Sequence, residues 1–160
     1  MKIPVTPIGL KRLKEQLSAF KAERPVVADQ IEEARAHGDL SENADYDAAK
    51  EKSGILEAKI RDLEAKVSSA DIIDPNKISS YDKIVFGACV EYEDMDSGQT
   101  KKINILGPAE SDTSKGIISI DTPLARALVG KKAGDVVEIR LPAGQREYEI
   151  LSVSAITVDY

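Results

Sequence analysis

The chain lacks the residues on which several classes of protein depend. It contains no tryptophan, one cysteine (Cys89) and one histidine (His37) among 160 residues. A single cysteine excludes an internal disulfide framework, and a single histidine excludes a zinc site built from several histidines. The longest mostly apolar run, residues 84–90, is too short to cross a bilayer, and the N-terminus has no apolar core typical of a signal peptide. We therefore expect a soluble, cytoplasmic protein with no membrane partner.

Positive charge is also scarce. Lysine and arginine together number 22 against 28 acids, which gives a net charge of −6. This balance argues against binding nucleic acid mainly through bulk charge. The hydrophobic fraction of 42% is still enough for a folded core. We find no glycine-rich phosphate loop and no Ser/His/Asp arrangement with usable partners, so the chain alone does not look like an enzyme.

Two ladders of apolar residues, spaced alternately by three and four, occupy the first half of the chain. They lie within residues 10–34 and 46–70, and this spacing is typical of a coiled-coil seam. Positions that sum to 80, such as Phe20 and Ile60, would pair if the chain folded back between the ladders. The pattern predicts an antiparallel two-helix hairpin over residues 7–72, with helices of about 28 residues and a length of roughly 40 Å. The narrow seam favours a projecting arm over two helices of a larger bundle.

The second half of the chain reads as a small sheet domain. A linker covers residues 71–83, and Thr122-Pro123 opens a short helix that Gly130 closes. Turn signals separate short β-like runs at residues 84–92, 101–106, 116–121, 135–141 and 147–153. The whole chain is therefore predicted to be α+β, with a coiled-coil arm over residues 1–74. A mostly antiparallel sheet domain with one short helix follows over residues 75–160.

The turn between the two predicted helices, near residues 38–47, carries four acids and no base. These acids are Asp39, Glu42, Asp45 and Asp47. One explanation is helix capping, with Asp39 as the N-cap of the second helix, Glu42 at N3 and the acids favoured by the helix dipole. The other explanation is a metal site, because Mg²⁺ prefers carboxylate oxygens but usually keeps water and phosphate ligands as well. Two carboxylates on a turn would then need a partner to complete the site, and the residues alone leave both explanations open.

Three stretches carry a resemblance to one known family. Residues 34–46, ARAHGDLSENADY, resemble the tip motif of the bacterial GreA/GreB transcript cleavage factors. Residues 84–88 and 122–130 resemble the C-terminal signatures of the same family. The likeness extends over nearly the whole chain, and it is closer to the GreA branch than to GreB.

This resemblance implies a fold, a partner and a role. It implies a C-terminal domain of FKBP-like fold that docks on RNA polymerase, and a coiled-coil arm that enters the polymerase secondary channel. Asp39 and Glu42 match the functional acids of the family. They would help to hold a second, weakly bound Mg²⁺ near the 3′ end of the nascent RNA, in a site shared with the polymerase.

The expected role is that of an accessory factor. The polymerase would cleave its own backtracked RNA, and the protein, which we expect to be a monomer, would stimulate that cleavage. Two alternatives remain at this point. One is a Gre-like inhibitor that obstructs the secondary channel, and the other is a coiled-coil adaptor or chaperone outside transcription.

Overall fold

The computed structural model describes residues 2–37 and 43–160. Contacts divide the chain into two units, one made of Met1–Leu10 with Ala70–Tyr160 and the other of Lys11–Ser69. We call the first the sheet unit and the second the arm. The division falls inside the first long helix, so that the first turn of this helix belongs to the sheet unit.

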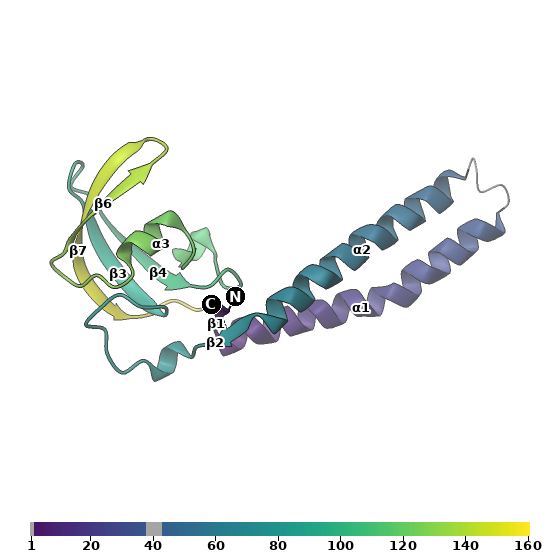
Figure 1. The fold of residues 1–160 in the computed structure, drawn as a ribbon, viewed down its shortest axis with the longest axis horizontal. Coiled ribbons are helices and arrows are strands. Elements are labelled where there is room, and N and C mark those ends of the chain that lie inside the picture. The colour runs from purple at the N-terminus through teal and green to yellow at the C-terminus, as the bar shows by residue number, and fades with distance from the viewer. Residues whose placement is uncertain (1, 38–42) are drawn as a thin grey trace. The chain divides into compact units, whose positions relative to one another are not determined.

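Two long antiparallel helices form the arm (Figure 1). Helix α1 covers Pro7–Ala36 and helix α2 covers Ala44–Ser68, and at 1.5 Å per residue the 30 residues of α1 span about 45 Å. Val27, Leu56 and Ile60 form the buried centre of the seam. Three half-buried residues complete this cluster, namely Leu17, Phe20 and Ile31. The predicted antiparallel hairpin is therefore confirmed.

Ion pairs on the rim of the seam follow the same antiparallel register. The Arg24 guanidinium donates two hydrogen bonds to the Glu57 carboxylate, at 2.8 and 2.9 Å, and Lys21 Nζ lies 3.3 Å from Glu64 Oε1. These pairs are largely exposed, so they contribute little to stability. The seam itself therefore supplies most of the stability of the arm.

The predicted hairpin is wrong at its C-terminal end. The predicted hairpin extended to residue 72, but Ala70–Ile72 forms strand β2. It pairs in parallel with strand β1, Ile3–Val5, which immediately precedes α1. Each of these strands has only three residues, which is too few to show the alternating apolar pattern of a strand next to the long helical pattern. Both chain connections into the arm are thus joined by one small parallel sheet.

The sheet unit contains a five-stranded mixed sheet with the order β5-β4-β3-β7-β6. All neighbours in it are antiparallel except β4 and β5, which are parallel. The short helix α3, Pro123–Leu128, begins after its N-cap Thr122, as predicted. The five strands are β3 (Ala88–Asp94), β4 (Thr100–Leu106), β5 (Ile117–Ser119), β6 (Val136–Leu141) and β7 (Gly144–Ala155). The α+β fold class is confirmed.

One predicted strand boundary was wrong. Residues 84–87 were expected to begin the first strand of the sheet, but β3 starts at Ala88. Ile84 is fully buried and Phe86 nearly so, and Gly87 follows with φ at +90°. Burial explains the apolar run, and the positive φ of Gly87 places a turn at the point where the sequence suggested a strand.

Two apolar clusters cover the two faces of the sheet. The larger cluster is formed by strands β3, β4, β6 and β7 together with Ala125 and Leu128 of helix α3. The smaller one gathers around Phe86, Leu106 and Ile117 and includes Tyr160, the last residue of the chain. The C-terminal end of the sheet unit is therefore part of its core packing.

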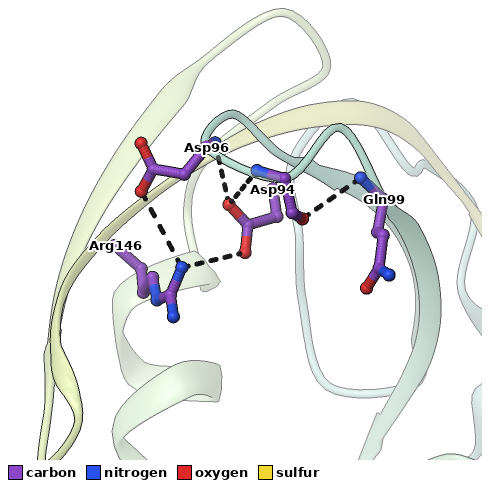
Figure 2. Close-up of polar contacts among 5 residues, drawn as sticks. Asp94, Asp96, Gln99 and Arg146 are labelled. Atoms are coloured by element: carbon purple, nitrogen blue, oxygen red, sulfur yellow. Dashed lines mark hydrogen bonds and ion pairs between the residues drawn. The ribbon is translucent and has the colours of Figure 1, made fainter.

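Polar contacts fix the turn between β3 and β4 (Figure 2). Asp94 Oδ1 accepts hydrogen bonds from the backbone N–H groups of Asp96, at 2.9 Å, and Ser97, at 3.4 Å. The Arg146 guanidinium on β7 lies 3.8 Å from Asp94 Oδ2. The hydrogen bond from the Asp96 backbone lowers the pKa of Asp94, so this contribution to stability is present above the ordinary carboxyl pKa and is lost as the pH falls through the lowered value.

Cys89 lies on β3 with 2% of its surface exposed, and burial raises the pKa of its thiol. Because the thiolate is the reactive form, we expect an aromatic disulfide reagent at pH 8 to react at least ~100-fold more slowly with the folded protein than with the denatured chain. The absorbance of the released aromatic thiol measures both rates. Equal rates would show that this part of the sheet opens readily in the native state.

Candidate functional site

The two acids predicted to act, Asp39 and Glu42, lie outside the described residues, as does Gly38. The structure describes the residues that flank them on both sides. Helix α1 ends at Ala36 and helix α2 begins at Ala44, so the connection that contains both acids joins the distal ends of the two helices.

Asn43 ties the two helix ends together. It is the N-cap of α2, and its Oδ1 accepts a hydrogen bond of 3.0 Å from the backbone N–H of Tyr46. Its Nδ2 donates a hydrogen bond of 2.6 Å to the carbonyl oxygen of Ala34, in the last turn of α1. One side chain thus supplies an acceptor to a backbone N–H in the first turn of α2 and a second donor to the Ala34 carbonyl, which also accepts a hydrogen bond of 3.2 Å from the backbone N–H of His37.

Of the two explanations for the acids, capping of the second helix by Asp39 is wrong, because the N-cap of α2 is Asn43. Asp45 and Asp47 lie in the first turn of α2, are exposed, and suit the positive end of the helix dipole. Asp39 and Glu42 precede the cap in the sequence. Helix capping therefore accounts for two of the four acids and leaves Asp39 and Glu42 without that explanation.

A groove of about 360 Å³ lies between the helices next to these ends. Small seam residues create it, since Ala34 and Ala49 are buried at 4% and 8% exposure and fill little space. Its charged lining includes Glu33, Asp45 and Lys52. The distal part of the arm is thus packed by alanines and lined by side chains of both charges.

The side chains of the described residues do not form a metal site on their own. No group of three or more His, Cys, Asp or Glu residues in ranges 2–37 and 43–160 is placed to hold an ion. Asp39 and Glu42 stand in the connection between the two helices. Their carboxylate oxygens are hard donors that suit Mg²⁺, but two carboxylates are too few to complete its coordination. A magnesium ion at this end of the arm would need further ligands from a partner.

Two lysines on α2 near the arm end make local contacts. Lys50 Nζ lies 5.4 Å from the centre of the Tyr46 ring, and Lys52 Nζ lies 3.4 Å from Gln30 Oε1. Tyr46 is half-buried, as expected for a seam residue. These contacts favour a role for both lysines in packing the arm surface.

Sequence reasoning missed two residues of structural weight. Asn43 was detectable, because an asparagine directly before an acid-rich helical turn is an N-cap signal. Glu110, a buried carboxylate in the sheet unit, leaves no comparable signal, because its partner Thr6 lies 104 residues away in the sequence.

Comparison with known proteins decides the family. Residues 3–72 match the family model "Transcription elongation factor, N-terminal", and residues 78–155 match "Transcription elongation factor, GreA/GreB, C-term". The chain belongs to the GreA/GreB family of transcription elongation factors. The predicted domain boundary at residue 74 lies between the two matched stretches.

Individual relatives place the chain in the GreA branch of this family. It is 49% identical over 153 residues to transcription elongation factor GreA of Verminephrobacter eiseniae, which covers 95% of this chain and 97% of the relative. It is 50% identical over 155 residues to GreA of Xanthomonas axonopodis pv. citri, with 96% and 98% covered. The crystal structure of GreA factor homolog 1 of Thermus thermophilus matches with 28% identity and a TM-score of 0.45, and covers 97% of this chain and 100% of that one.

No helix in the described part of the chain has the length and apolar character needed to span a membrane.

Proposed function

We propose that this protein binds bacterial RNA polymerase in the cytoplasm and stimulates the polymerase to cleave its own backtracked RNA. The sheet unit would dock on the polymerase, and the arm would enter the secondary channel. Asp39 and Glu42 would then reach the reaction centre near the 3′ end of the nascent RNA. In this proposal the polymerase carries out the hydrolysis, and the protein is an accessory factor that works as a monomer.

The observation that carries the proposal is the position of the two acids in the chain. Both stand in the seven-residue connection, residues 37–43, between the distal ends of helices that are about 45 Å and 38 Å long. Asn43 caps α2 from its own side chain, so helix capping does not require either acid. Two carboxylates at the end of a long, narrow arm are suited to act on something outside the protein.

Magnesium is the cofactor implied by this role. Asp39 and Glu42 would supply two of its oxygen ligands, and the polymerase and the RNA phosphates would supply the others. When bound there, the ion would supply charge neutralisation for the hydrolysis of a phosphodiester. The part of this chain is to bring two carboxylates to the reaction centre, where they raise the local concentration of hard oxygen donors.

The direct test is RNA shortening in a backtracked polymerase complex. A complex with 3′-labelled and 5′-labelled RNA is incubated with Mg²⁺, with and without the purified protein. We expect a short 3′ fragment to be released at least ~10-fold faster with the protein, since a well-placed catalytic group contributes about 10²-fold or more. Electrophoresis of the labelled RNA measures the rate.

A second arm of the same experiment separates the alternatives. Nucleotide addition is measured on a complex that is not backtracked. Strong slowing of addition without cleavage would favour a channel inhibitor and contradict the proposal. Absence of any binding to the polymerase would instead favour an adaptor or chaperone outside transcription.

A further inference from the structure

Glu110 is a buried carboxylate to which the proposed function gives no role. Its side chain is 4% exposed and lies in the turn that follows β4. Its Oε1 accepts a hydrogen bond of 2.6 Å from the backbone N–H of Thr6, and its Oε2 accepts one of 3.1 Å from the backbone N–H of Gly107. Burying a carboxylate costs free energy unless hydrogen bonds satisfy its oxygens, and here each oxygen of Glu110 accepts one.

The bond to Thr6 completes the N-terminus of helix α1. Thr6 is the residue before the helix, and its Oγ1 accepts a hydrogen bond of 2.9 Å from the backbone N–H of Gly9. In a capping box the third helical residue is an acid whose side chain reaches back to the N–H of the N-cap. Here that third residue is Gly9, which has no side chain, and Glu110 makes the bond from 104 residues away. The first turn of α1 has no acid of its own, so Glu110 also supplies the negative charge that the helix dipole favours.

Two glycines make room for this carboxylate. A Cβ atom at Gly9 would overlap Glu110 Oε1, and one at Gly107 would overlap the carbonyl oxygen of Pro4 and lie 3.1 Å from Glu110 Oε2. Neither glycine has a positive φ. The absence of a side chain at each position is therefore needed for space and not for backbone conformation.

The surroundings of Glu110 lie where the chain enters the long helix. Strand β1 runs directly into Thr6, and the Val5 carbonyl accepts a hydrogen bond of 2.9 Å from the backbone N–H of Ile73, just after β2. Among the described residues, Glu110 is the one buried charged side chain, and its bond to Thr6 lies at the first turn of α1.

We propose that Glu110 is a positioning residue for transcript cleavage. It holds the first turn of α1 onto the sheet unit and so limits the directions in which the arm can point. This inference rests on the proposed function, in which the sheet unit docks and the arm acts. Because α1 is one continuous helix, a tilt of about 10° in its first turn would move the end of a rod of about 45 Å by about 8 Å. A displacement of even about 1 Å can cost a catalysed reaction about 10²-fold.

The test compares two variants that disturb this contact from opposite sides. Glu110→Gln keeps the size of the side chain but replaces one acceptor oxygen by an amide donor, so one of the two backbone N–H groups loses its partner. Gly9→Ala keeps the carboxylate and pushes it away from Thr6. Glu138→Gln, the same change at an exposed acid of β6, is the matched control.

Three quantities are measured for each variant. The first is the cleavage rate at saturating protein, and the second is the affinity for the backtracked polymerase complex. The third is the distribution of distances between spin labels at Glu51→Cys on the arm and Arg140→Cys on the sheet unit, both exposed positions. This third measurement uses the free protein and needs no polymerase.

We expect Glu110→Gln and Gly9→Ala to lower the saturated cleavage rate at least ~10-fold, with a broader distance distribution and an affinity within about threefold of the parent protein. Glu138→Gln should match the parent in all three. A purely structural role would lower affinity and rate together through loss of folded protein, which circular dichroism of each variant measures.

Three outcomes would overturn the inference. One is an unchanged rate and distance distribution in both variants, and another is a loss of affinity alone with the saturated rate preserved. The third is a change in Glu110→Gln that Gly9→Ala does not share, although both are folded. If the parent protein fails to stimulate cleavage, the proposed function itself fails, and the distance distribution then decides separately whether Glu110 holds the helix.

Discussion

Replacing Asp39 and Glu42 by alanine together should abolish stimulated RNA cleavage while polymerase binding persists. In the proposed function these two carboxylates are the ligands that the protein lends to a magnesium ion, and such charge stabilisation is worth several kcal/mol in the transition state. A loss of about 3 kcal/mol corresponds to roughly a 100-fold slower reaction. The rate of fragment release at saturating protein measures the effect, and competition with the parent protein measures binding.

The adjacent helical turn offers a matched control for this pair. Asp45→Ala with Asp47→Ala also removes two acids, but these lie in the first turn of α2, where the dipole favours each by about 0.3–1 kcal/mol. We expect this control to keep most of the cleavage activity and to lower the melting temperature slightly. Equal losses in both double variants would mean that overall negative charge, and not the named pair, is what the reaction needs.

The arm could be predicted from the sequence because its information is local and periodic. Each step of three or four residues reports on the same seam, and errors at single positions cancel over many steps. Arg24 shows the limit of this reasoning. It occupies a seam position in the sequence pattern, yet its guanidinium binds Glu57 on the exposed rim. The spacing of apolar residues predicts which positions of the two helices face each other. It does not predict that a long polar side chain at a seam position points outward to the rim.

The base of the arm could not be predicted in the same way. Strands β1 and β2 are three residues each and separated by the whole arm, and neither has enough residues to show an alternating pattern. The role of Glu110 is even harder to predict from the sequence. A capping box is recognised by its residue spacing within one helix, and here the acid comes from another part of the chain. Contacts of long sequence separation leave no spacing to read.

At the tip of the arm, the sequence resemblance and the structure support different parts of the proposed function. The tip motif named Asp39 and Glu42 as the functional pair, and these two roles stay predictions. Asn43 adds a physical argument, because it removes the need for either acid as a helix cap. Without the structure, capping explained all four acids equally well, and the functional pair could not be separated from the helical pair by charge alone.

The second large effect is expected at the centre of the arm, where Ile60 is 1% exposed and packs with Val27 and Leu56. Ile60→Ala should cost the arm about 2–5 kcal/mol, because it removes buried methyl groups and leaves a cavity in a seam that cannot easily collapse. For a unit of this size, such a loss lowers the melting temperature by at least about 8 °C. Thermal melting followed by circular dichroism at a helical wavelength measures it.

Ile55 provides the matched control for this substitution, since it is the same residue type on the same helix but 52% exposed. Ile55→Ala removes the same atoms from a position that is largely in water, so it should change the melting temperature by no more than a few degrees. The comparison isolates burial from helix propensity, which improves equally in both variants. If Ile60→Ala melts like Ile55→Ala, the three-residue centre of the seam does not hold the arm together. A stiff two-helix arm, on which delivery of Asp39 and Glu42 depends, would then need another source of rigidity.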